Sequence, residues 1–155
     1  IEESEEDVII KQKNIFTVIL NGKDQLLVED EVMELEELRD AAIKFLDNGG
    51  GSGEDKCDYC KGAGDPKSSD NPDKAIISLK NERETTYATY ISVQNELVAA
   101  YTSLRNQRAE ELFGLSYTEM LKNYKDVNWP GSKSKLKENI TQIKLEYPQK
   151  LSEVQ

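Results

Sequence analysis

Residues 14–38 read Asn14-Ile-Phe-Thr-Val-Ile-Leu-Asn-Gly-Lys-Asp-Gln-Leu-Leu-Val-Glu-Asp-Glu-Val-Met-Glu-Leu-Glu-Glu-Leu38, and this stretch decides the fold. Residues 14–20 and 25–29 are rich in β-branched and other apolar side chains, which predicts two strands. Between them lies Asn21-Gly22, the strongest short-range signal for a hairpin, because both central residues of a type I′ turn need a positive φ. We therefore expect a β-hairpin with a type I′ turn at Asn21-Gly22.

A helix is predicted directly after this hairpin, over residues 33–47. Its apolar side chains recur at helical spacing, at Leu35, Leu38, Ala42 and Phe45. Asn48 and the glycines after it tolerate the left-handed conformation that commonly ends a helix. We expect the helix to stop there.

The second half of the chain predicts one more interior strand and several helices. Residues 75–79 are almost continuously apolar, which is typical of a strand covered on both faces. A long helix follows from a cap at Thr86 to Gly114, and a capping box at Ser116 opens a short helix through about Tyr124. Near the end of the chain, the spacing of Leu136, Ile140 and Ile143 predicts a further helical turn or two. A final strand is predicted within residues 144–154, and Pro148 confines it to an edge of the sheet.

This order of elements predicts an α/β (α+β) fold, a two-layer sandwich in which a small mixed β-sheet has helices mainly on one face. The chain of 155 residues fits one domain with its own core. We assign residues 14–155 to that domain and residues 1–13 to an acidic, membrane-proximal linker. Residues 8–10 are either a short edge strand or part of this linker.

Composition excludes several classes of function. The formal net charge of −10 argues against nucleic acid as a partner, because phosphate binding needs a basic surface. Histidine is absent, which removes the commonest general base and metal ligand. The sequence also lacks a phosphate-binding glycine pattern. We therefore predict that the chain is not an enzyme and has no catalytic residue and no cofactor.

Residues 48–74 form a long polar connection rich in Gly, Asp, Ser and Pro. Compact domains rarely contain a structureless loop of this length. This insert is either an ordered excursion tied by Cys57 and Cys60 or a mobile segment.

Cys57 and Cys60 are the one constellation that could carry chemistry, and three alternatives stay open for them. They could form a local disulfide that ties the insert in an oxidising compartment. They could bind zinc, but a protein-only site would then need two further ligands from carboxylates or another chain. They could act as a redox pair, although the motif lies in an acidic loop rather than at a helix N-terminus. No metal ligands are assigned.

Three other groups of residues invite a functional interpretation, and each has a simpler structural one. The carboxylates between Glu29 and Glu37 match no calcium-binding loop and suit the solvated first turn of a helix. Tyr87, Tyr90 and Tyr101 are expected in the core, at its rim or in a dimer surface. Trp129 either anchors a partner peptide or packs its turn on the domain.

Several stretches together resemble the periplasmic domain of the ExbD/TolR family, in the branch found in Bacteroidetes-type bacteria. The hairpin and helix over residues 14–46, with Leu27-Val28-Glu29 and Leu35-Glu36-Glu37-Leu38, are similar to the opening unit of that family. Residues 69–83 resemble its central strand, and residues 86–97 resemble the helix that follows. Residues 147–153 resemble its C-terminal strand.

The resemblance implies a function without catalysis. Members of this family are single-pass proteins of the bacterial inner membrane, anchored by an N-terminal helix, with this domain in the periplasm. They form homodimers and work with an ExbB/TolQ-like channel protein and a TonB/TolA-like protein in uptake driven by the proton motive force. The family's membrane aspartate has no counterpart in these 155 residues. The alternative function is a periplasmic metal-binding or redox module centred on Cys57 and Cys60.

Overall fold

A mixed β-sheet of five strands forms one layer of the protein. The computed structural model describes residues 12–154, and within them the strands lie in the order β3-β2-β1-β4-β5. β1 pairs antiparallel with β2 and parallel with β4, while β3 and β5 form the two edges. The bounds of the strands are β1 (Ile15–Leu20), β2 (Leu26–Val28), β3 (Glu31–Met33), β4 (Ile76–Asn81) and β5 (Leu151–Val154).

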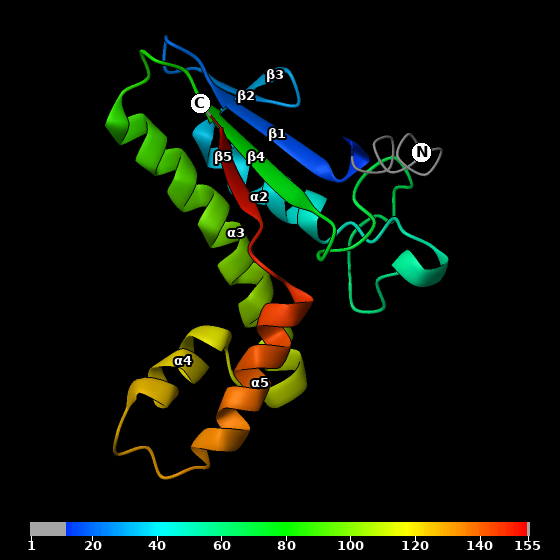
Figure 1. The fold of residues 1–155 in the computed structure, drawn as a ribbon, viewed down its shortest axis with the longest axis vertical. Coiled ribbons are helices and arrows are strands. Elements are labelled where there is room, and N and C mark those ends of the chain that lie inside the picture. Colours follow the sequence, from blue (N-terminus) through cyan, green and yellow to red (C-terminus); the bar gives the residue numbers. More distant parts are fainter. Residues whose placement is uncertain (1–11, 155) are drawn as a thin grey trace, which may run out of the picture.

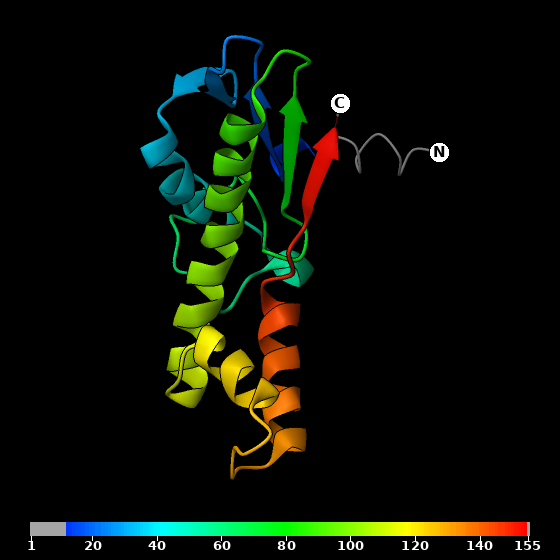
Figure 2. The same ribbon diagram turned by 90° about the vertical axis from the view of Figure 1, so that its left-hand side faces the viewer.

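Helices α2 (Leu35–Leu46) and α3 (Tyr87–Phe113) form the second layer and cover one face of this sheet (Figures 1 and 2). The predicted fold class, a two-layer α+β sandwich with helices mainly on one face, is confirmed. The remaining helical elements are η1 (Gly53–Asp55), α4 (Tyr117–Lys125) and α5 (Lys133–Glu146).

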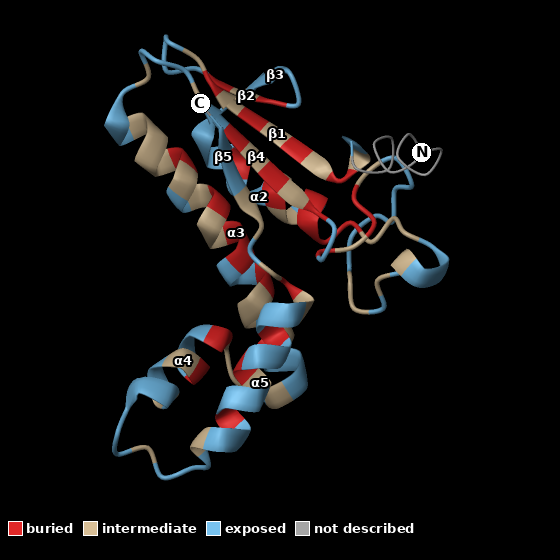
Figure 3. Ribbon diagram, viewed as in Figure 1, coloured by how far each residue is buried: buried red, intermediate tan, exposed pale blue. Residues whose placement is uncertain are grey.

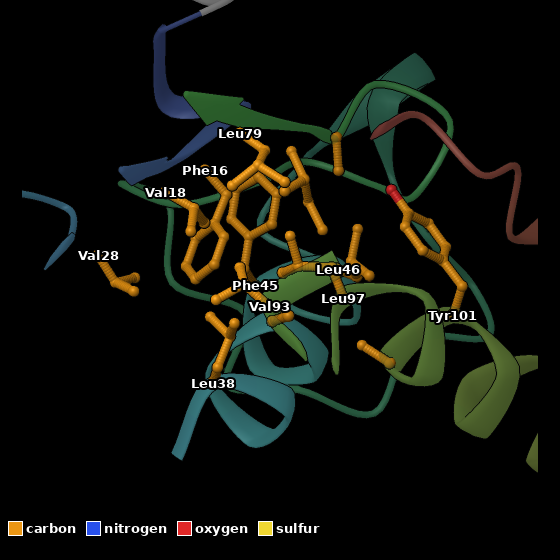
Figure 4. Close-up of a cluster of buried hydrophobic side chains, with 14 of the residues drawn as sticks. Phe16, Val18, Val28, Leu38, Phe45, Leu46, Leu79, Val93, Leu97 and Tyr101 are labelled. Atoms are coloured by element: carbon orange, nitrogen blue, oxygen red, sulfur yellow. The ribbon is translucent and has the colours of Figure 1, made fainter. Parts of the chain in front are cut away.

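Alternation along the strands places the core between the two layers. Phe16, Val18 and Leu20 of β1 point to the helices and are almost fully buried (Figures 3 and 4). The ring of Phe16 stacks on Phe45 of α2 with 4.9 Å between the ring centroids. Side chains two apart on a strand share a face, so β1 gives the core one apolar row and leaves a second row on the opposite face.

A second hydrophobic cluster lies away from the sheet, where α3 continues past the sandwich to meet α4 and α5 (Figure 1). We call this part, residues 109–147, the helical lobe. Its buried side chains are Ala109, Tyr117, Met120, Leu136, Ile140 and Ile143. Trp129 packs on this cluster, which agrees with the simpler interpretation of the turn at Trp129-Pro130.

The hairpin of β1 and β2 is as predicted, but the type of its turn is not. Neither Asn21 nor Gly22 has a positive φ; the left-handed residue is Asp24, with φ 58°. Asn21 instead organises a five-residue loop, because its side-chain oxygen accepts hydrogen bonds from the amides of Lys23 and Gln25, both at 3.0 Å.

The two-residue turn with positive φ occurs later, at Glu29 (φ 51°) and Asp30 (φ 68°). It connects β2 to β3, a strand that the sequence analysis missed. Because β3 runs to Met33, the helix predicted from residue 33 begins only at Leu35.

Two predictions at the C-terminal end need correction, and one at the N-terminal end cannot be compared. The helical turns around Leu136 are a helix of 14 residues that runs to Glu146, so the final strand is short and begins only at Leu151. Pro148 precedes that strand rather than interrupting it. The strand or linker predicted at residues 8–10 lies outside the described residues.

Side-chain caps fix the ends of the long elements. Thr86 and Ser116 each accept a hydrogen bond from the amide three residues later, and Ser132 does the same for α5. Gly114 ends α3 with φ 71°, in the left-handed conformation that glycine adopts without steric cost.

Two glycine substitutions test this backbone description. Gly114→Ala should lower the free energy of unfolding by about 1 kcal/mol, because alanine resists the left-handed conformation. Gly22→Ala should change it by less than about 0.5 kcal/mol, because Gly22 has no positive φ and an added Cβ would meet Glu84 at an ordinary 3.4 Å. Urea unfolding of both variants measures the difference, and equal effects would contradict the observed turn geometry.

Candidate functional site

Cys57 and Cys60 form a disulfide with their Cα atoms 5.6 Å apart. Both side chains are half-buried, and they lie in the middle of the insert. Residues 12–154 contain no group of three or more His, Cys, Asp or Glu side chains that could hold a metal ion. In this form both sulfurs bond to each other, so the pair offers no thiolate to a metal.

The insert is ordered, and Asn48 is the residue that organises it. The Asn48 side chain, almost fully buried, donates hydrogen bonds to the carbonyl oxygens of Asp65 (2.9 Å) and Ser69 (2.8 Å). It also accepts one from the amide of Asp65 at 3.0 Å. One amide side chain thus satisfies three backbone groups, which explains how so polar a segment can pack on the sandwich.

Two glycines allow close backbone approaches, one between the insert and the end of α2 and one within the insert. A Cβ on Gly62 would lie well under 3.0 Å from the carbonyl oxygen of Asp47, which accepts a hydrogen bond from the Gly62 amide at 2.9 Å. A Cβ on Gly50 would clash in the same way with the carbonyl of Asp65. The glycines of this segment are therefore packing positions rather than signs of a mobile linker.

Asp47, at the end of α2, is a buried carboxylate that joins three parts of the chain. It accepts hydrogen bonds from the Tyr147 hydroxyl at 2.7 Å and from the Lys61 amide at 3.1 Å. Burial raises the pKa of Asp47, and these hydrogen bonds oppose that rise. Burial and the bond to Asp47 likewise raise the pKa of Tyr147, so its hydroxyl remains a donor at neutral pH.

Tyr59, inside the disulfide ring, connects the insert to the helical lobe. Its hydroxyl donates to the carbonyl oxygen of Glu146 at 2.6 Å, and its ring meets the ring of Tyr147 edge-on at 5.4 Å. The Arg108 guanidinium lies 5.1 Å from the ring centroid and also pairs with the Glu146 carboxylate at 2.5 Å. Burial, followed by the charge of Glu146, raises the pKa of Tyr59 to about 12.

An open groove of about 580 Å³ begins at Tyr59 and runs along the outer face of α5. Its walls are mainly apolar stems and methyl groups, although most of the side chains end in polar groups. It is lined by Tyr59, Ser134, Lys137, Glu138, Thr141, Gln142, Leu145 and Glu146. The groove presents no converging set of catalytic groups.

The acidic residues between Glu29 and Glu37 do not converge on one point. They are distributed over the turn after β2, the edge strand β3 and the first turn of α2. Burial raises the pKa of Glu29, and a hydrogen bond from the Thr17 backbone opposes that rise. This arrangement agrees with a solvated surface and a helix start, as expected.

The three tyrosines of α3 occupy different environments. Tyr101 is fully buried, and its hydroxyl accepts a hydrogen bond from the Lys150 amide at 3.2 Å. Tyr90 lies at the rim of the core, whereas Tyr87 is 77% exposed in the first turn. Tyr101 and Tyr90 are therefore core and rim residues as predicted, whereas Tyr87 is a surface residue, and the three do not form a stacking platform.

The face of the sheet turned away from the helices carries a row of mainly apolar side chains across all five strands. The register places Val32, Leu27, Ile19, Lys80 and Val154 beside one another in that order. Val32 is 66% exposed and Val154 is 46% exposed. A second pair, Ile15 and Ile76, lies further along the same face.

Comparisons with protein-family models, with curated proteins and with solved structures found no match to this chain. Among residues 12–154, none of the helices has both the length and the apolar character needed to cross a lipid bilayer.

The sequence analysis singled out the cysteines but missed the residues around them. Asp47, Tyr59 and Tyr147 come from three distant positions and meet only in the folded chain. The one local signal was Tyr59, an aromatic residue in an otherwise polar loop. An aromatic side chain in such a loop suggests a packing contact, because leaving it exposed to solvent would not stabilise the fold.

Gly62→Ala tests whether the insert is an integral part of the domain. The added Cβ must displace the backbone of Asp47, so we expect a loss of about 2–4 kcal/mol in unfolding free energy. Thermal and urea unfolding provide the measurement, with Gly22→Ala as the matched control. A wild-type midpoint would mean that residues 57–64 do not pack on α2 in solution.

Asp47→Asn tests the buried carboxylate through pH. Because the folded chain binds the Asp47 proton more strongly than the unfolded chain, the Asp47 contribution to stability falls as pH rises from the ordinary pKa of 3.8 through the raised folded pKa. The stability of the wild type relative to Asp47→Asn should therefore decline as the pH rises above about 4 and level off once the pH has passed the raised pKa of folded Asp47. Urea unfolding at several pH values measures this, with the exposed Asp58→Asn as control; parallel wild-type and Asp47→Asn curves would contradict it.

Proposed function

We propose that this chain is the periplasmic domain of a membrane-anchored, ExbD/TolR-like component of an energy-transduction complex driven by the proton motive force. In this proposal the domain serves TonB-dependent uptake of nutrients or biopolymers. It acts without catalysis, by forming a homodimer and by contacting an ExbB/TolQ-like channel protein and a TonB/TolA-like protein.

The observation that carries the proposal is the open, largely apolar face of the mixed sheet. Helices α2 and α3 cover one face, whereas no helix within residues 12–154 covers the other, where the row from Val32 to Val154 crosses all five strands. Exposed apolar side chains gathered on one face mark an interaction site more often than isolated ones do. Here they surround Lys80, and a polar row of Thr17, Ser78 and Ser152 lies beside them. The order of the first elements, with a hairpin, α2, the central strand β4 and the long helix α3, supports the resemblance on which the family assignment depends.

The alternative of a metal-binding module finds no support in residues 12–154, because the two sulfurs are bonded to each other and too few other ligands are grouped. A contact function also agrees with the shape of the groove along α5, which has apolar walls but no converging titratable groups.

Self-association of the domain tests the contact surface. Ile19→Lys places a charge in the middle of the apolar row, and we expect it to weaken the dimer at least about tenfold. Val127→Lys is the matched control, because Val127 is 90% exposed between α4 and α5 and lies outside both the sheet and the groove along α5. Sedimentation equilibrium gives both dissociation constants, and equal values for the two variants would exclude the open face as the dimer surface.

The gene upstream of the codon for Ile1 tests the membrane-anchored assignment independently. A single apolar segment of about 20 residues that carries one aspartate would agree with it. A cleavable signal peptide in that place, or a start without such a segment, would contradict it.

A further inference from the structure

We propose that the Cys57–Cys60 disulfide is a thiol–disulfide exchange site, and that its reduction by a dithiol releases Tyr59 and loosens the attachment of the helical lobe to the sandwich. This inference does not depend on the proposed function.

Tyr59 lies within the ring that the disulfide closes. The bond closes a ring of four residues, Cys57 to Cys60, and Tyr59 is one of the two residues between the sulfurs. Such a small ring contributes little to the stability of a whole domain. The ring instead restricts the backbone conformation of the residues that it contains.

On one side, Tyr59 and the neighbouring Lys61 contact α3 and the end of α5. Tyr59 bonds to the carbonyl of Glu146 and packs against Arg108 and Tyr147, so it touches both α3 and the end of α5. Lys61, next to the ring, pairs with Glu111 of α3. The ring is therefore attached to the helical lobe on one side.

The opposite side of the ring rests on the sandwich. Gly49 leaves room for it, because a Cβ there would lie 2.8 Å from the Cβ of Cys60. The amide of Lys61 donates to Asp47 at the end of α2. A constraint that fixes this ring thus adds a link between the lobe and the sandwich, beside α3 itself and the hydrogen bond from Tyr147 to Asp47.

The disulfide lies in a stretch of the insert with exposed residues on both sides, which lets an incoming thiolate approach it. Both cysteines are half-buried rather than enclosed, and the neighbouring Asp58 is exposed. A thiolate of the incoming dithiol attacks one sulfur, the Cys57–Cys60 bond breaks, and the other cysteine leaves as a thiolate that takes up a proton. The second thiol of the dithiol then attacks the mixed disulfide. The dithiol is oxidised to its own disulfide by two electrons, and both cysteines become thiols.

Hydrogen exchange measured on the whole chain, with dithiothreitol as the dithiol, tests the proposal. Thiol titration of the native protein should find two thiols per chain after treatment. Amide exchange should then rise about tenfold at residues 57–62 and at the end of α5, residues 143–147, because the ring constraint is lost. Residues 15–20 of β1 serve as the internal control and should exchange at the same rate before and after reduction.

Two variants separate the switch from a general loss of stability. Cys57→Ser with Cys60→Ser should show the faster exchange at residues 143–147 without any reductant. Tyr59→Leu should show it with the disulfide intact, and reduction should add nothing further at residues 143–147. That non-additivity is the signature of a coupling that runs through Tyr59.

Three results would overturn the proposal. The first is a disulfide that resists dithiothreitol in the native chain. The second is a reduced chain whose exchange at residues 143–147 is unchanged. The third is faster exchange throughout the sheet, including residues 15–20, which would make the bond a general support of the fold.

Discussion

The parallel pairing of β1 with β4 is the constraint on which the rest of the structure depends. Parallel neighbours cannot be joined by a tight turn, so the chain must travel from one end of the sheet to the other between them. Here α2 and the insert span the distance between the two ends of the sheet. Asn14 and Asp70 fix its end with a reciprocal pair of buried hydrogen bonds, at 2.8 and 3.2 Å, just where β1 and β4 begin. The insert is therefore an integral part of the crossover connection between β1 and β4.

Placing the insert in the crossover explains its composition. A segment that packs on a helix end through its backbone needs partners for its amides and carbonyls, and these come from Asp47, which caps α2, and from Asn48, the first residue of the insert. It also needs positions without side chains where backbones meet, and Gly62 is one. Abundant glycine and polar residues usually indicate a linker, but here the same residue types serve close packing.

The sequence predicted what depends on local patterns. Apolar periodicity located β1, β4 and the helices, and hydroxyl and glycine caps located the ends of α3 at Thr86 and Gly114. It did not predict the turn between β2 and β3, because Glu29 rarely adopts a left-handed conformation and Asp30, which tolerates one, is not followed by the glycine that usually marks such a turn. The junction around Tyr59 also escaped prediction, since its partners come from α3 and α5 and no spacing along the chain connects them.

The connection between β4 and β5 has a consequence for how the chain folds. These two strands pair in parallel, yet α3, α4 and α5 all lie between them in the chain. Contacts between residues so far apart form late, because a long loop must close first. During synthesis on the ribosome, β4 has β1 beside it early but lacks its second neighbour until residues 151–154 of β5 have been made. For that period the growing protein has an incomplete sheet edge at β4, and burial of that edge waits for the assembly of the helices.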